Sequence, residues 1–215
     1  MIPARSHGFH RHDNARLIIF KGGGYRERTL TGEARLAHGD FILRPACHAH
    51  DGQGESSAGY VSIPIDANVL RDCLARHGHA PRRGRVPDDW DGDGHSLLKH
   101  VETRPYESRP DCTPLDRAAS RLIDPEPPAL SDLAEELDLK PWEFSRAFRA
   151  RFGLSPTGYR CEARLQRAIS LMVGAPARLS QIAADAGYAD QSHFCRELRQ
   201  RTGHTASRLA RLVGG

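Results

Sequence analysis

Two runs in the C-terminal half begin with polar or aromatic side chains and continue with arginines along one side of a helical pattern. The first run carries Trp142, Ser145, Arg146 and Arg149, and the second carries Gln191, Ser192, His193, Arg196 and Arg199. An arginine can donate two hydrogen bonds to guanine, and a glutamine can pair in a similar way with adenine. Side chains of these types on one helix face are suited to reading base edges in the major groove of DNA.

The two runs belong to an internal repeat, in which residues 133–156 line up with residues 182–206. Phe144, Arg146 and Gly153 correspond to Phe194, Arg196 and Gly203, and Leu133-Ala134 corresponds to Ile182-Ala183. Each unit has the pattern of a short helix, a tight turn and a longer helix, which predicts a helix-turn-helix. Gly187 suits the second turn because glycine adopts positive φ freely, and Asp138, an uncommon but tolerable left-handed residue, stands in the first.

Helices are the elements that must position these side chains. Apolar spacing and capping residues predict seven helical segments from Pro114 onward, with glycines at several of their ends. Residues 155–173 are predicted to form one long helix that joins the two units. Such a spacer can hold two reading helices about one DNA turn, roughly 34 Å, apart. A plain helical bundle with surface arginines is the alternative, and the matched repeat favours DNA reading over it.

The helical half resembles the AraC/XylS family of bacterial transcription regulators. The resemblance covers about 100 residues and rests on LAEEL, FSRAFRARFGLSP, YRCEARLQRA and LSQIAADAGYADQSHFCRELRQRTG, as they stand in this sequence. It implies base reading by Trp142, Ser145 and Arg146 in the first unit, and by Gln191, Ser192 and Arg196 in the second. Leu198 stands where the family usually has Phe, and Ala206 where it usually has Pro.

That resemblance implies a sequence-specific transcription regulator whose partner is a double-stranded DNA operator. RNA polymerase would be a further partner if the regulator is an activator. Regulators of this family usually carry a sensing domain for a small-molecule or metal effector, often a cupin-like barrel. A homodimer is expected, formed through that barrel or through a helix over residues 67–78.

The N-terminal half contains short runs typical of β-strands. They cover residues 16–20, 25–30, 40–45 and 59–65, and glycines separate them. Their spacing predicts a small antiparallel barrel or sandwich. We therefore expect an α+β protein with a cupin-like β-barrel in residues 1–80, a linker in 81–113, and an all-α domain with two helix-turn-helix units in 114–215.

Residues 9–51 resemble a cupin, and the resemblance implies a metal site formed by His10, His12, Glu27 and His50. Neutral imidazoles with a carboxylate suit Zn, Fe, Ni or Mn. The interval between His12 and Glu27 is longer than in the cupin motif. The histidines could equally line a pocket for an organic effector without metal. Cys47 and His48 could add ligands, or Cys47 could pack as a small buried residue.

Composition narrows the class of protein without deciding it. The 215 residues carry a net charge of +4 with a pI of about 8.9, which is compatible with nucleic-acid binding but does not require it. We expect a cytoplasmic protein, because the sequence has neither a signal-peptide pattern nor an apolar run that could span a membrane. The five cysteines show no CxxC pairing, which favours reduced thiols.

The sequence shows no nucleophile and base in an ordered pair, so no catalytic residue and no enzymatic activity are expected. Two other readings stay open at this stage. One is a cupin metalloenzyme fused to a DNA-binding domain. The other is a DNA-binding protein whose barrel serves only for dimerisation.

Overall fold

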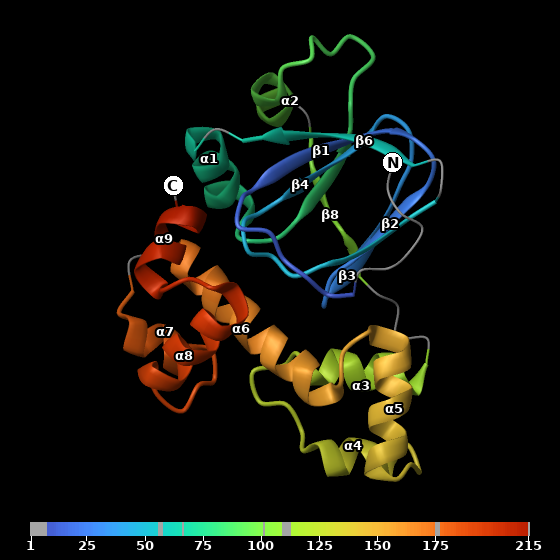
Figure 1. Cartoon of the computed structure of the whole chain (residues 1–215), viewed down its shortest axis with the longest axis vertical. Helices are drawn as coiled ribbons and strands as arrows, with labels where there is room; N and C mark the ends of the chain where they lie inside the picture. The colour runs from blue at the N-terminus through green and yellow to red at the C-terminus, as the bar shows by residue number, and fades with distance from the viewer. Residues whose placement is uncertain are drawn as a thin grey trace.

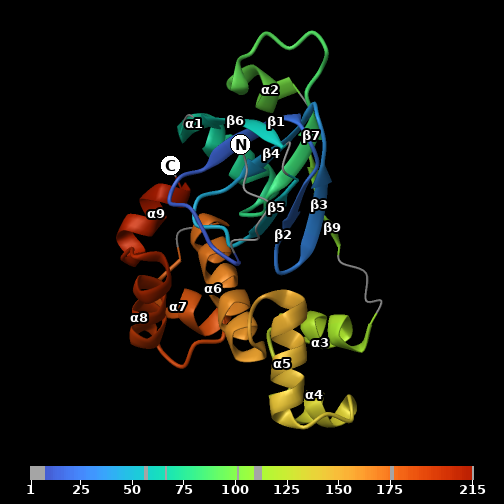
Figure 2. The ribbon, with the colours of Figure 1, turned by 45° about the vertical axis from the view of Figure 1, so that its right-hand side comes forward.

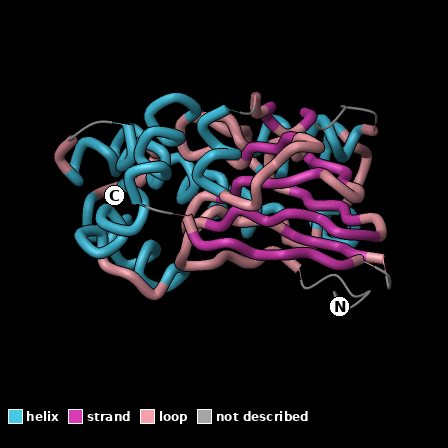
Figure 3. The backbone as a smooth tube through the Cα atoms, turned by 90° about the horizontal axis from the view of Figure 1, so that it is seen from above, coloured by secondary structure: helices cyan, strands magenta, loops and turns pink. Residues whose placement is uncertain are grey.

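The computed structural model describes residues 8–55, 58–65, 67–100, 102–108, 113–174 and 177–214. All nine of its strands lie in the N-terminal half, and the described residues from Pro114 onward form only helices and their connections (Figure 1). Seen from above, the strands gather at one end of the molecule and most of the helices at the other (Figure 3). The expected α+β fold class is therefore confirmed.

Two antiparallel sheets form the N-terminal half. The first has the order β6-β1-β4-β7-β8 and consists of β1 (Arg16–Gly22), β4 (Asp40–Arg44), β6 (Gly59–Pro64), β7 (Arg82–Arg85) and β8 (Arg104–Pro105). The second has the order β5-β2-β3-β9 and consists of β2 (Tyr25–Arg28), β3 (Gly32–Leu36), β5 (Asp51–Gly54) and β9 (Glu107–Ser108). The described strands thus form two separate sheets, and the closed barrel that we expected is not formed.

Alternation along β1 explains how the first sheet is covered on both faces. Ile18 and Phe20 pack toward the second sheet, where Ala34 and Leu36 of β3 meet them. Leu17 and Ile19 point the other way, because successive side chains of a strand face opposite sides. Two helices cover that outer face, α1 (Ala67–His77) and α2 (Gly94–His100), with apolar side chains that include Val69, Cys73, Leu97 and Leu98.

The expectation that residues 81–113 form a linker is wrong for most of this segment. Arg82–Arg85 extends the first sheet by pairing with β4, and Glu107–Ser108 pairs with β3 in the second sheet. Gly84 is required for the close approach of β7, because a Cβ there would lie 2.6 Å from the Phe41 ring. The N-terminal half therefore continues to Ser108.

The described residues of the helical half form seven helices, as the sequence predicts: α3 (Pro114–Leu122), α4 (Leu130–Glu136), α5 (Pro141–Phe152), α6 (Pro156–Gly174), α7 (Leu179–Asp185), α8 (Gln191–Thr202) and α9 (Ala206–Gly214). The pair α4–α5 and the pair α7–α8 lie at opposite ends of the long helix α6 (Figure 2). At about 1.5 Å per residue, the 19 residues of α6 span roughly 28 Å.

The turns of the two units have the backbone conformations that the repeat predicts. Asp138 has φ 51° and Gly187 has φ 83°, so both turns use a left-handed residue at the same position. Gly153 and Gly203 end α5 and α8 in the same conformation, with φ 77° and φ 73°. The start of α8 is capped by Asp190, whose side chain accepts from the His193 amide at 2.7 Å. These local interactions fix where each long helix begins and ends.

Candidate DNA-binding surface and sensor cavity

The first unit presents its predicted reading residues on the exposed side of α5. Trp142 is 57% exposed, the highest value among the large apolar side chains. The Arg146 guanidinium lies 5.0 Å from the centre of the Trp142 ring, so the two side chains stack in a cation–π contact. Arg149 is exposed one turn further on, whereas Ser145 is partly buried. Phe144 and Phe148 are buried on the opposite side of the helix.

The second unit has a similar division. Gln191, Ser192, Arg196 and Arg199 are exposed on α8, and Phe194 and Leu198 are buried. His193 differs from the other predicted residues because its ring packs edge-on against Tyr188, with the centres 5.3 Å apart. Its Nε2 also lies 3.8 Å from a carboxylate oxygen of Glu197. The His193 side chain therefore makes its contacts within its own helix-turn-helix unit.

Sequence reasoning missed a charged network behind α8. Glu197 is buried on the inner side of the helix, where Arg164 of α6 donates to it at 2.9 Å and Arg201 forms an ion pair with it at 3.0 Å. Arg164 also stacks on the Tyr188 ring at 4.4 Å. The spacing of four residues between Glu197 and Arg201 is the signal in the sequence that could have predicted their ion pair. Their network fixes α8 on α6, because a buried carboxylate without its cations would be costly.

In the N-terminal half, His10, His12 and His50 come together as the sequence predicts. One nitrogen from each ring lies within 4.8 Å of the others, which suits three ligands around one cation. A backbone bridge holds the cluster, since His10 and His50 exchange N–H···O bonds of 2.9 and 3.0 Å. Bringing residue 10 to residue 50 in this way requires the antiparallel sheet framework.

Two of these imidazoles, His12 and His50, favour the neutral form that a metal needs. Burial, and then the charge of Arg44, lower the pKa of His50 to about 2. Burial is also the main cause of the lowered pKa of His12. The His50 Nδ1 lies 3.1 Å from the carbonyl of His48, and a carbonyl can only accept. The proton is therefore on Nδ1, and the Nε2 lone pair is available for a ligand.

Glu27 does not join the histidines, contrary to our expectation. Its buried carboxylate forms an ion pair with Arg44 and accepts a hydrogen bond of 2.8 Å from the Tyr106 hydroxyl. The carboxylate is needed there because Arg44 is itself buried between the sheets. His48 also lies apart, facing His79 with ring centres 5.9 Å apart. Neither residue belongs to the ligand cluster, and we exclude Glu27 from it.

A cavity of about 810 Å³ opens beside the histidine cluster. Its walls combine the three histidines with three arginines, Arg11, Arg16 and Arg44, and with the aromatic rings of Phe20, Tyr25 and Tyr60. Guanidinium groups favour an anionic ligand, and aromatic walls favour an apolar body. The cavity can therefore accept a small organic anion, with or without a metal.

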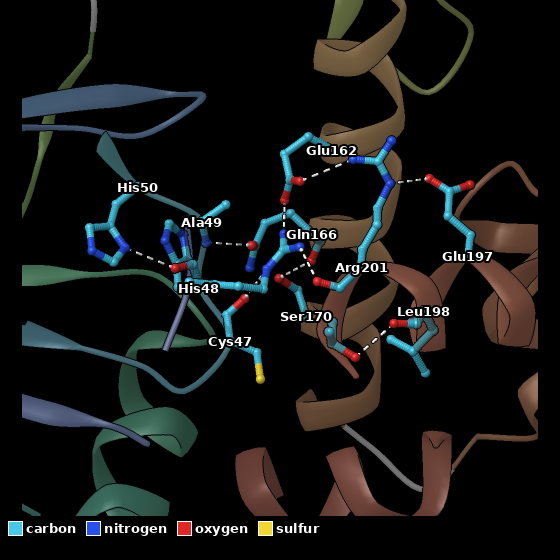
Figure 4. A network of polar contacts seen from close by, with 12 residues as sticks. Cys47, His48, Ala49, His50, Glu162, Gln166, Ser170, Glu197, Leu198 and Arg201 are labelled. Carbon is cyan, nitrogen blue, oxygen red and sulfur yellow. Dashed lines mark hydrogen bonds and ion pairs between the residues drawn. The ribbon is translucent and has the colours of Figure 1, made fainter. Parts of the chain in front are cut away.

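The same region contacts the helical half. Arg11, which lies between His10 and His12 in the sequence, forms an ion pair with Glu162 of α6. It also donates a hydrogen bond of 3.3 Å to the carbonyl of Arg201 in α8. Gln166 of α6 donates to His79 at 2.8 Å. Figure 4 shows Glu162 and Gln166 between the loop Cys47–His50 and the side chains of Arg201 and Glu197. The N-terminal half is thus directly connected to α6 and α8.

The helical half is similar in sequence to known proteins. Residues 133–211 match the family model described as a helix-turn-helix domain. The transcriptional regulator ExsA of Pseudomonas aeruginosa is 33% identical over 79 residues, which are 37% of this chain and 28% of that protein. The matched part thus spans little more than a quarter of this relative's length. None of the described helices is long and apolar enough to cross a membrane.

Two solved structures are also similar. ToxT from Vibrio cholerae has a TM-score of 0.45 at 14% identity, over 100% of this chain and 97% of that chain. A transcriptional regulator with an AraC-type DNA-binding domain, from Chromobacterium violaceum, has a TM-score of 0.41 at 25% identity, over 45% of this chain and 88% of that chain. The helical half thus matches a helix-turn-helix family model and is similar in sequence to part of a transcriptional regulator.

Proposed function

We propose that the protein is a sequence-specific transcription regulator, which binds double-stranded DNA through α5 and α8 and responds to a small molecule or metal in its N-terminal half. The main support is that two helix-turn-helix units present similar exposed faces at opposite ends of α6. Arg146 and Arg196 hold matching positions in these faces, and each can pair with guanine. The similarity to a transcriptional regulator favours this function over catalysis.

The histidine cluster and its cavity support the response to an effector. His10, His12 and His50 would hold one divalent cation, of which Zn, Fe, Ni and Mn suit imidazole ligands. Bound there, the cation would offer an open coordination position toward the cavity. An organic anion held by Arg16 and Arg44 alone is the alternative effector.

Arg11 supports a link between effector and DNA. It lies between two of the histidines in sequence, and its side chain contacts both α6 and α8. A ligand that shifts this segment changes contacts with the helix that carries the second reading face. The response requires different ligand affinities in the two arrangements.

We propose a homodimer that forms through the edge strand β6. Tyr60 and Val61 on this strand are 51% and 45% exposed, and the free edge of the sheet can pair with a second copy. Helix α1 is less suited, because Val69, Leu70 and Leu74 are buried within the chain. Sedimentation of the Tyr60→Ser/Val61→Ser double variant tests this, since persistence of the dimer would rule out β6 as the interface.

DNA selection from a random duplex library, followed by footprinting, tests the function itself. The full chain should enrich one sequence and protect two adjacent major-groove segments on one face of the DNA. Titration of that complex with zinc, or with a chelator, should then change the affinity. Failure to enrich any sequence would contradict base reading, whereas enrichment with no response to metal would leave an organic effector as the remaining form of the proposal.

A further inference from the structure

A second group of ligand atoms lies between the two halves of the chain. Asp13, Cys47 and His204 each offer one atom, and these atoms all lie within 4.8 Å of one another. Asp13 follows the histidine segment, Cys47 lies in the loop after β4, and His204 follows the glycine that ends α8. The group therefore combines two residues of the N-terminal half with one of the DNA-binding domain.

The imidazole of His204 is buried without satisfactory partners. Its side chain is only 6% exposed. Nδ1 has no hydrogen-bond partner among the described residues, and Nε2 lies 3.0 Å from Asp13 Oδ1 without the direction of a hydrogen bond. A buried polar atom without a partner is destabilising, and a bound cation would supply that partner.

Cys47 is held so that its thiol stays at this boundary. Its amide donates to the His12 carbonyl at 2.7 Å, and its own carbonyl accepts from Arg11 Nε at 3.2 Å. The residue is fully buried, packed in the same cluster as Ala206 and Leu209 of the helical half. In Figure 4 the sulfur points away from the polar network around Glu162. The thiol is thus part of the contact between the halves rather than of the histidine cavity.

We propose that Asp13, Cys47 and His204 bind a divalent cation of the zinc type, which joins the N-terminal half to the C-terminal end of α8. Thiolate, imidazole and carboxylate are the ligand types that zinc prefers. A tetrahedral zinc ion holds its ligand atoms roughly 3.3–3.8 Å apart, so small side-chain movements complete the site. Asp13 is 62% exposed, which leaves room for water as the fourth ligand.

Binding involves proton release and no redox change. The bond between Cys47 Sγ and the cation replaces the S–H bond, and the proton passes to solvent. Because the ligands come from both halves, the cation binds only when the halves are docked. It therefore shifts the equilibrium toward the docked arrangement and restrains the helix that carries Gln191 and Arg196.

Cobalt(II) distinguishes this site from the histidine cluster, because only one of the two clusters contains sulfur. The full chain with His12→Ala, which removes a ligand of the histidine cluster, is titrated with cobalt under reducing conditions. We expect a thiolate-to-cobalt charge-transfer band in the near ultraviolet, together with the visible bands of tetrahedral cobalt. Added zinc should abolish both. Cys47→Ser should remove the charge-transfer band, whereas the matched variants Cys73→Ser and Cys161→Ser should keep it.

Asp13→Asn provides a test that does not depend on altering the core, because Asp13 is exposed. It should weaken cobalt binding by at least the ~10-fold typical of losing a supporting group at a metal site. Circular dichroism without metal checks that each variant is folded. The proposal is overturned if the parent protein shows no thiolate band at saturating cobalt. A band that persists in Cys47→Ser, or an unchanged affinity in Asp13→Asn, also overturns it.

Discussion

Arg11 reaches across the boundary between the two halves and forms a buried ion pair with Glu162 of α6. Burial raises the pKa of Glu162, while Arg11 and Arg201 act in the opposite direction. The carboxylate thus depends on cations from two different parts of the chain. Removal of either one changes both stability and the contact between the halves.

Arg11→Ala should lower the free energy of unfolding by about 3 kcal/mol, because it leaves Glu162 buried with Arg201 as its remaining cation. Urea unfolding measures the change. Arg35→Ala serves as the control, since Arg35 is exposed, Glu33 is partly exposed, and loss of their pair should cost no more than about 0.5 kcal/mol. Equal stability of the two variants would show that the Arg11 pair does not hold the halves together.

Arg146→Ala and Arg196→Ala should each cost about 1–3 kcal/mol of specific DNA binding and relax the preference at one base pair. Trp142→Ala should share part of the Arg146 effect, because the ring orients the guanidinium. Binding to a panel of single-base variants of the selected duplex measures both quantities. Arg104→Ala, exposed on β8, is the matched control. Unchanged base preference in both reading variants would refute the model of two reading helices.

Specific affinity should fall steeply with salt. Arginine contacts to phosphates release counterions, and each contact contributes about −0.9 to the slope of log K against log salt. Arg149 and Arg199 are exposed on the two reading helices and are candidates for such contacts. Arg149→Ala should make the slope less negative by about one while leaving the base preference unchanged. A slope identical to that of the parent would place Arg149 outside the interface.

Stability should fall as the pH decreases from about 6.5 to about 4. Burial lowers the pKa of His79 to about 4, so the folded protein keeps this ring neutral while the unfolded chain takes up a proton near 6.5. Unfolding then gains one proton in this interval, worth about 1.4 kcal/mol per pH unit. His79→Gln should reduce this slope by one proton, measured by urea unfolding with chelator present. An unchanged slope would mean that His79 titrates alike in both states.

Metal analysis of protein purified without chelator or affinity tag should find one cation at the histidine cluster. The metal bound at this cluster is the difference in metal content between the parent and the His12→Ala/His50→Ala variant. A cation bound elsewhere contributes equally to both proteins and does not affect this difference. Ligand deletion removes the ion because the remaining imidazole cannot hold it alone. DNA binding by the full chain should then lose its response to metal. Equal metal content in both proteins would leave the histidines as part of an organic-ligand pocket.

Local signals in the sequence predict the helical half well. Gly153, Gly187 and Gly203 mark turns and helix ends by their own conformational freedom, and the inward spacing of Phe144 and Phe194 marks the packed faces. These features depend on neighbours a few residues away. Pattern analysis along one chain therefore recovers them.

The N-terminal half depends on partners far away in sequence, and several of its features were missed. The strand Asp51–Gly54 has no apolar pattern, but Gly52 is favoured beside Tyr25 because an added Cβ would clash with the Tyr25 hydroxyl. The cupin resemblance predicts Glu27 as a metal ligand, whereas its ion pair with Arg44, 17 residues further on, cannot be read from spacing. The cupin resemblance predicts that His10 and His50 meet, because a family motif carries information about contacts that are distant in sequence.

The contact between Tyr159 and Leu30 limits how the two halves can be exchanged by protein engineering. The Tyr159 hydroxyl of α6 donates to the Leu30 carbonyl at 2.5 Å, and the Leu30 side chain completes the apolar cluster around α5. Ala46 and Cys47 complete the cluster around α8 in the same way. A chimera that joins this helical half to a foreign N-terminal domain would have to replace the Leu30, Ala46 and Cys47 side chains and the Leu30 carbonyl acceptor. Division of the chain at residue 113 would therefore remove N-terminal residues from both apolar clusters of the helical half.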